Sequence, residues 1–227
     1  MDLQDHGRQK QGLPLPRIET GGLLIGLTGT YCSGKNHIAA MLCGRGFPVL
    51  DIDKLGYVCL ENSKKEIFAK FGGDLENQDG SLNRKALGAR VFGNRERLAA
   101  LEAIVHPQAN LMTEQWIAGQ KGRTCVLNAA LLHKTSVFGR LNCIILVRAP
   151  RLVRLMRAKR RDSLPWKEIF RRFASQKKFM SQYLCGNADI YRVENPGNGM
   201  RGTSGGFKAR QKLERRIDEI LAALNRK

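Results

Sequence analysis

The chain has 227 residues and a formal net charge of +19, because 39 Lys and Arg stand against 20 Asp and Glu. Hydrophobic residues make up 42% of it, and every apolar run is far shorter than the ~20 residues that a membrane span requires. These properties exclude a membrane-spanning helix and favour one α/β domain large enough to bury a core.

The first segment, residues 1–22, is polar and of mixed charge, without the apolar stretch of a secretory signal. We interpret it as a flexible N-terminal extension before a domain at 23–225. We therefore expect a soluble, cytoplasmic protein that is not associated with a membrane.

A phosphate-binding loop follows the first predicted strand. The apolar run 23–28 leads into Gly29–Asn36, which satisfies the pattern G-x-x-x-x-G-K, and a helix-compatible stretch at 38–42 comes next. The order strand, glycine loop, helix is the order that this motif requires. The alternative is an ordinary strand-to-helix turn whose glycines only relieve backbone strain.

The residue types of the loop suit phosphate. Its backbone N–H groups would surround phosphate oxygens, and Lys35 would place a positive charge between the β- and γ-phosphates. Asn36 stands where Ser or Thr normally binds Mg²⁺, and it offers only an amide oxygen. For Cys32 we expect a lowered pKa, because Lys35 and a helix N-terminus lie close to it.

The remaining elements alternate between strand and helix. The sequence predicts strands at 48–52, 126–127, 141–147 and 190–193, and helices at 151–160, 165–184 and 208–224, with a Gly-rich loop at 197–206. Residues 54–118 are predicted to be mainly helical, with interruptions at 72–74, 79–80 and 106–107. This alternation indicates a parallel sheet covered on both faces. Its ligand would lie at the carboxyl ends of the strands, where the loop, Asp51 and Asp53 fall.

Basic residues are densest between 148 and 178. Such an excess favours phosphorylated small molecules, nucleic acid or an anionic membrane, although a solvated helix face is the simpler alternative. Aromatic residues are only 7% and are not interleaved with the basic run, so we do not expect a nucleic-acid partner. The six cysteines and four histidines lack metal-ligand spacing, so we predict no metal site built by the protein.

Taken together, these residues resemble the dephospho-CoA kinase family. The resemblance spans about residues 23–220 and combines the loop with a strand ending in D-x-D, a middle region, a lid pattern and a closing pattern. The matching residues are Leu27-Thr28-Gly29, Ser33-Gly34-Lys35, Val49–Lys54, Asp79-Gly80, Arg84, Leu87, Val91-Phe92, Leu101-Glu102, His106-Pro107, Ala149-Pro150, Arg157, Arg161-Asp162, Arg172, Gln176, Ala188-Asp189 and Asn195-Pro196-Gly197.

The resemblance implies a three-layer α/β P-loop kinase fold with a central parallel sheet, a helical substrate-binding region at about 54–122 and a small helical lid at about 150–184. It also implies ATP-dependent phosphorylation of the ribose 3′-hydroxyl of dephospho-CoA, with Mg²⁺ held mainly by ATP and water. The residues implied are Lys35, Asp53, Arg157 and Arg161 for catalysis, Asp51, Asp53, Arg84 and His106 for the substrate, and Gly29, Thr30, Tyr31, Cys32, Ser33, Gly34, Lys35, Asn36 and His37 for ATP.

Individual assignments have simpler alternatives. Asp53 could act only as the N-cap of the following helix, and Arg157 and Arg161 could be solvated charges. His106-Pro107 is interpreted as structural, shaping a helix break.

Several positions depart from the family pattern. Asn36 replaces a hydroxyl residue, Asn128 stands for an Asp, and Lys134 stands for a Glu. These changes keep two other interpretations open: a related nucleoside or nucleotide kinase, and a catalytically weakened nucleotide-binding protein. We expect Asn36→Ser to raise turnover or to tighten Mg²⁺ dependence, and we expect a monomer or a weak homo-oligomer.

Overall fold

The computed structural model describes residues 22–176, 183, 188–197, 204–224 and 226. Within them, five strands form one sheet in which every neighbouring pair is parallel, in the order β2-β3-β1-β4-β5. The strands are β1 Leu24–Gly29, β2 Val49–Asp51, β3 Cys125–Asn128, β4 Cys143–Arg148 and β5 Asp189–Glu194. The predicted α/β fold with a central parallel sheet is confirmed.

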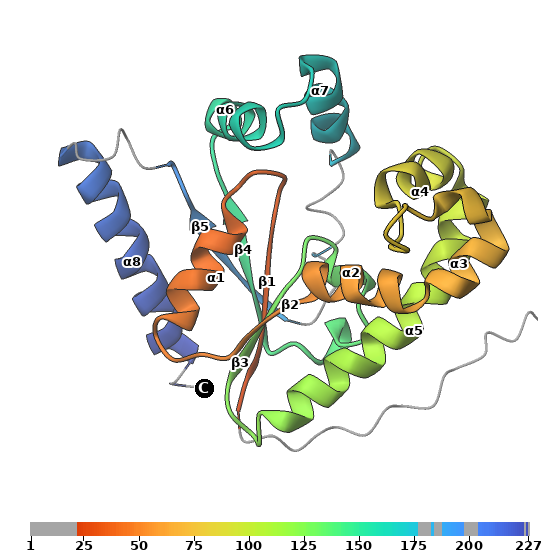
Figure 1. The fold of residues 1–227 in the computed structure, drawn as a ribbon. Helices are drawn as coiled ribbons and strands as arrows, with labels where there is room; N and C mark the ends of the chain where they lie inside the picture. Colours follow the sequence, from red (N-terminus) through yellow and green to blue (C-terminus); the bar gives the residue numbers. More distant parts are fainter. Residues whose placement is uncertain (1–21, 177–182, 184–187, 198–203, 225, 227) are drawn as a thin grey trace, which may run out of the picture.

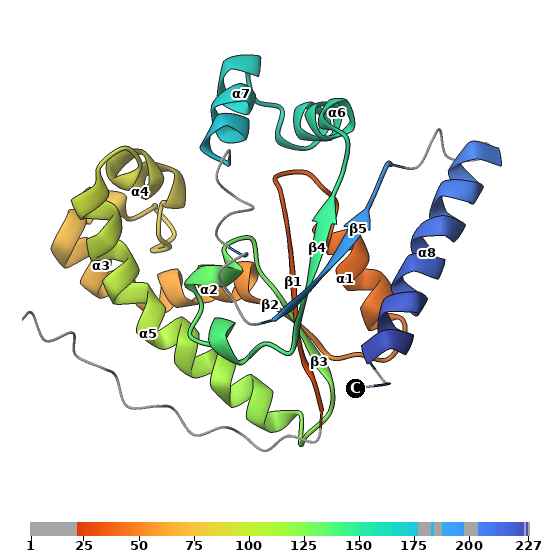
Figure 2. The same ribbon diagram turned by 180° about the vertical axis from the view of Figure 1, so that it is seen from behind.

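Helices cover both faces of the sheet (Figures 1 and 2). They are α1 Lys35–Cys43, α2 Ile52–Asn62, α3 Lys64–Phe71, α4 Arg84–Val91, α5 Arg95–Gly119, α6 Arg151–Asp162, α7 Trp166–Ser175 and α8 Ser204–Leu224, with short 3₁₀ turns at Gly73–Leu75, Leu132–Lys134 and Phe138–Arg140. Helices α1 and α8 lie on one face and α5 on the other. Helices α6 and α7 lie beyond the carboxyl ends of the strands.

The two faces have separate cores because strand side chains alternate in direction. Ile25 and Leu27 of β1 pack on the face of α1 and α8, with Ile217 among their partners. Leu24 packs on the opposite face with Ile117 of α5. Both faces of the central strands are therefore buried, which explains their continuous apolar sequence.

Two smaller clusters lie outside the sheet. Helices α3 and α4 pack around Ile67 and Leu87, and α5 contributes partly buried apolar side chains to the same cluster. Helices α6 and α7 pack through Ala158, Ile169 and Phe173, and this cluster also contacts the phosphate loop. The helices predicted at 54–122 and within 150–184 are thus present, but the helix predicted at 165–184 ends at Ser175. Residues 177–182 and 184 lie outside the described residues, as do 1–21.

The predicted helix interruption at His106-Pro107 is wrong. Helix α5 runs without a break from Arg95 to Gly119, with Pro107 inside it. Proline removes one backbone donor and disfavours the helix locally, but α5 packs against α2 along this stretch and buries Val105 and Ile117. The loop predicted at 197–206 is also shorter, because α8 begins at Ser204.

No helix in the described part of the chain is both long enough and apolar enough to span a membrane.

The docking of α8 onto the sheet generates a stability prediction. Ile217 is fully buried between α8 and the strands, so Ile217→Ala removes apolar contacts and leaves a cavity. We expect a loss of about 2–5 kcal/mol in the free energy of unfolding, measured by urea denaturation. The control Arg215→Ala removes an exposed side chain of the same helix and should change this free energy by less than about 0.5 kcal/mol. Equal losses in the two variants would contradict the packing described for α8.

Candidate active site

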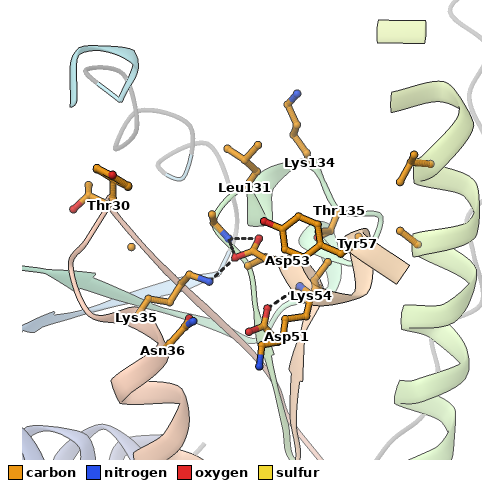
Figure 3. Close-up of a pocket in the computed structure, with 18 of the residues that line it drawn as sticks. Thr30, Lys35, Asn36, Asp51, Asp53, Lys54, Tyr57, Leu131, Lys134 and Thr135 are labelled. Atoms are coloured by element: carbon orange, nitrogen blue, oxygen red, sulfur yellow. Dashed lines mark hydrogen bonds and ion pairs between the residues drawn. The ribbon is translucent and has the colours of Figure 1, made fainter. Parts of the chain in front are cut away.

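A cavity of about 910 Å³ lies at the carboxyl ends of β1, β2 and β3. The phosphate loop forms one side of it, and the first turns of α2, the middle of α5 and the residues after β3 form the others (Figure 3). Parallel strands bring these segments together because their carboxyl ends share one edge of the sheet.

Two glycines of the loop are required by close packing. Gly34 has φ 90°, and a Cβ there would lie 2.2 Å from Nδ2 of Asn195. A Cβ on Gly29 would lie 2.5 Å from Oγ of Ser33. The loop is therefore held tightly against its surroundings, and the first amides of α1, which begins at Lys35, lack intrahelical acceptors. Such amides are donors suited to phosphate oxygens.

The carboxylate of Asp53 joins three parts of the site. Lys35 donates from Nζ to its Oδ2 at 2.7 Å, and the backbone N–H of Ala130 donates to both of its oxygens at 3.0 and 3.2 Å. Figure 3 shows Lys35 and Asp53 pointing toward each other across the cavity. The Asp53 side chain remains 41% exposed, so its oxygens are accessible from the cavity.

Capping of α2 is the role of Asp51, whose Oδ1 accepts from the backbone N–H of Lys54 at 3.1 Å. The alternative that Asp53 serves only as the helix N-cap is therefore wrong. The two aspartates of the D-x-D pattern therefore have different contacts: Asp51 caps α2, and Asp53 binds Lys35 of the loop.

Arg157 supports the loop from outside the cavity. Its guanidinium donates to the backbone carbonyl of Ser33 at 3.0 Å and to Oδ1 of Asn195 at 3.2 Å. Asn195, which follows β5 and is buried, donates from Nδ2 to the same Ser33 carbonyl at 2.9 Å. Burial lowers the pKa of Arg157. These contacts fix the backbone of the loop where its amides turn inward.

Helices α6 and α7 contact the loop through Tyr31. The Tyr31 hydroxyl binds Asp162, its backbone N–H donates to Oε1 of Gln176 at 2.7 Å, and the guanidinium of Arg161 lies 5.3 Å from its ring centre. Asp162 also binds Arg161 and Arg172, and hydrogen bonding from Arg161 is the main reason that its pKa is lowered. Arg161 reaches the cavity wall and is held there by an aromatic face and a carboxylate.

The opposite side of the cavity is mostly apolar. Tyr57 and Leu60 of α2 face Leu101 and Val105 of α5, with His106 beside them. Tyr57 also borders a second cavity of about 520 Å³, which Arg84 and Lys85 line. The guanidinium of Arg84 lies over the Tyr57 ring, 4.7 Å from its centre.

The side chains that depart from the family pattern, Asn36, Asn128 and Lys134, have partners within the protein. Asn128 is buried and donates from Nδ2 to Oδ1 of Asn36 at 3.2 Å. Lys134 pairs with Glu102 of α5. Among the described residues, no three His, Cys, Asp or Glu side chains gather as a metal-ion site.

Comparison with known proteins assigns the family. The family model described as dephospho-CoA kinase matches residues 23–191. The chain is 38% identical over 207 residues to a dephospho-CoA kinase of Treponema denticola, covering 86% of this chain and 91% of the relative. It is 36% identical over 154 residues to the enzyme of that name from Thermus thermophilus, covering 68% and 75%. The chain belongs to the dephospho-CoA kinase family.

Solved structures support the same fold. A crystal structure from Thermus thermophilus superposes with a TM-score of 0.71 at 31% identity, covering 89% of this chain and 98% of that one. A dephospho-CoA kinase from Campylobacter jejuni gives 0.54 at 22% identity, covering 88% and 98%, and supports the fold alone.

The structure brings together most, but not all, of the residues that the family resemblance suggested. Gly29 to Asn36, Asp51, Asp53, His106 and Arg161 line the main cavity. His37 is exposed and Arg157 lies behind the loop, while Arg84 lies at the second cavity; none of the three lines the main one.

Sequence reasoning gave Asn195 and Tyr57 no role in the site. Asn195 stood in the Asn-Pro-Gly pattern after a predicted strand. Tyr57 lies one helical turn after Asp53, so its spacing could have placed it on the same face of α2.

The expectation of a low pKa for Cys32 is wrong. Burial raises the pKa of the Cys32 thiol above its ordinary value, and the positive residues that oppose this effect, Arg161 first, do not outweigh it. Cys32 also has φ 59°, a strained conformation for a residue other than glycine.

A raised pKa predicts slow alkylation of Cys32. At pH 8 its thiolate fraction should be smaller than that of an ordinary cysteine, and N-ethylmaleimide should modify the exposed Cys43 first. Mass spectrometry of peptides over time measures both rates in one sample. Faster labelling of Cys32 than of Cys43 would contradict the effect of burial.

Proposed function

We propose that this protein transfers the γ-phosphoryl group of ATP to the ribose 3′-hydroxyl of dephospho-CoA, giving coenzyme A and ADP. The observation that carries the proposal is the pairing of Asp53 with Lys35 at the edge of a phosphate loop, inside a cavity with one polar and one apolar side. Phosphoryl transfer needs positioning and charge neutralisation more than covalent chemistry, and this arrangement supplies both.

ATP binds at the loop end of the cavity in this proposal. The N-terminal amides of α1 and Nζ of Lys35 contact the phosphate oxygens, because both are donors aimed at the same space. Arg161, held on the lid by Tyr31 and Asp162, adds a forked positive group beside the phosphates. Arg157 acts as a positioning residue that holds the loop backbone.

Asp53 orients the acceptor hydroxyl and receives its proton. The ribose oxygen attacks the γ-phosphorus, the bond from that phosphorus to the β–γ bridging oxygen breaks, and ADP leaves with the electron pair. The hydroxyl proton passes to the Asp53 carboxylate, whose position is fixed by the N–H of Ala130. Lys35 neutralises charge on both the carboxylate and the phosphates.

The apolar side of the cavity suits the remainder of dephospho-CoA. Tyr57, Leu101 and Val105 offer apolar surface for an extended aliphatic and amide chain, and His106 offers a polar edge. Arg84 and Lys85, in the second cavity that Tyr57 borders, supply positive charge for a substrate phosphate.

Magnesium is carried by the nucleotide in this proposal. Asp51 caps α2, Asp53 is bound by Lys35, and Asn36 accepts from Asn128, so these side-chain oxygens already have partners. A Mg²⁺ ion readily keeps several waters and uses substrate phosphates as ligands. The residues present therefore fit an ion held by ATP and water.

A second candidate is a nucleotide-binding protein with weakened catalysis. The observation that favours it is the loss of acidic groups at Asn128 and Lys134, the latter paired with Glu102. Tight ATP binding without formation of coenzyme A would select this candidate.

The kinase proposal predicts the outcome of one assay. Purified protein with ATP, Mg²⁺ and dephospho-CoA should form coenzyme A, measured by chromatography. Lys35→Ala and Asp53→Asn should each lower kcat/KM by roughly 100-fold or more, because each removes a charge from the reacting groups. The control Lys65→Ala removes an exposed lysine of α3 and should leave the rate unchanged. Absence of product with the unaltered protein would refute the proposal.

A further inference from the structure

Asn36 and Asn128 form a pair of side-chain amides beneath the phosphate loop. Asn36 is in the first turn of α1, is exposed and lines the main cavity. Asn128 is the last residue of β3, is only 1% exposed and does not line the cavity. Nδ2 of Asn128 donates to Oδ1 of Asn36 at 3.2 Å, so a buried amide holds the oxygen of an amide that lines the cavity.

The pair lies where phosphate-loop enzymes generally place their metal ligands. In such enzymes a Ser or Thr hydroxyl at the end of the loop and an Asp at the end of a neighbouring strand hold Mg²⁺. Here β1 and β3 are neighbouring strands, and both side chains are neutral amides that bind each other. Both positions that would supply oxygen ligands to a cation thus carry amides instead, the exposed Asn36 and the buried Asn128.

The hydrogen bond determines which atom of Asn36 faces the cavity. Because Oδ1 accepts from Asn128, Nδ2 is the side-chain group of Asn36 that remains for a ligand in the cavity that Asn36 lines. Its two N–H donors suit an anion and cannot bind a cation. Oδ1 of Asn128 is buried and has no hydrogen-bond partner in the part of the chain that the structure describes.

We propose that Asn36 donates an N–H directly to a nucleotide phosphate oxygen, and that Asn128 is the positioning residue that holds the Asn36 amide in this orientation. The end of the loop then recognises phosphate through a fixed donor, and nucleotide binding depends little on a divalent cation. The inference rests on the proposed function only in taking a nucleotide phosphate as the occupant of the loop.

The neighbouring charges are consistent with a phosphate occupant and a donor at this position. Lys35 precedes Asn36, Arg161 borders the same cavity, and the carboxylate of Asp53 is bound by Lys35 and Ala130. An added N–H donor strengthens the attraction for an anion there. A divalent cation bound at the same place would be repelled by the positive side chains.

The test measures ADP binding by calorimetry, once in EDTA and once in excess Mg²⁺. ADP is used because it cannot transfer a phosphoryl group to the acceptor. For the unaltered protein we expect the two dissociation constants to agree within about threefold. Asn36→Ser should weaken binding in EDTA by roughly tenfold, because the shorter serine lacks the amide N–H that Asn128 orients toward the charged phosphate. Mg²⁺ should recover part of this loss, since the serine hydroxyl is a metal ligand.

Asn128→Leu tests the orienting role from a position that does not line the cavity, and it introduces no new metal ligand. A leucine side chain is similar in size but cannot donate a hydrogen bond, so Oδ1 of Asn36 loses its partner and is free to turn toward the nucleotide. We expect weaker ADP binding in EDTA and stronger Mg²⁺ dependence, as for Asn36→Ser. A thermal melting curve checks that this variant folds. If the variant does not fold, Asn36→Ser still tests the inference, because Asn36 is exposed.

The control Asn62→Ser makes the same substitution at the exposed end of α2 and should leave both dissociation constants unchanged. The inference would be overturned if the unaltered protein binds ADP more than tenfold more weakly in EDTA than in Mg²⁺, or if Asn36→Ser binds as tightly as the unaltered protein in EDTA. Failure to bind ADP in either condition would overturn both the inference and the proposed function. Metal-independent ADP binding without formation of coenzyme A would contradict the proposed function alone.

Discussion

The carboxylate of Asp53 is the contact on which the site depends. Asp53 follows β2. It binds Lys35 of the loop after β1 and the backbone N–H of Ala130, which lies just beyond β3. The ends of three strands are therefore joined through one side chain. Only a parallel sheet brings these ends to one edge, so the order of the strands and the position of this ion pair are consequences of the same topology.

The loop is held from two directions, which gives it a fixed shape before any ligand binds. Arg157 and Asn195 bind the Ser33 carbonyl, and Tyr31 joins the loop to the end of α6 through Asp162. Cys32 adopts its strained φ of 59° between these two attachments. A conformation that costs roughly 1–3 kcal/mol persists where the surrounding contacts over-determine it, and here they set the direction of the loop amides.

The elements that the sequence predicts well are those with a local physical signature. Ile25 and Leu27 belong to a short apolar run before a glycine loop, and that pattern identifies a buried strand without knowledge of its neighbours. Pro107 shows the limit, because a local preference for a break is overridden by packing of α5 against α2. Cys32 shows another limit, since burial against α6 and α7 decides the direction of its pKa shift, and this burial cannot be read from adjacent residues. The choice between Asp51 and Asp53 as helix cap likewise depends on where β2 ends and α2 begins.

Three positive side chains at the site have counter-ions within the protein. Lys35 is paired with Asp53, and Arg161 and Arg172 share Asp162, so each group is held in place without exposing unpaired charge. A phosphate ligand would compete with these carboxylates for the same donors. Such an exchange costs less than ordering free side chains, because the long side chains of lysine and arginine lose rotamer freedom when they are fixed. The amide pair of Asn36 and Asn128 fits this arrangement, since neutral groups add a donor to the cavity without adding another carboxylate that phosphate must displace.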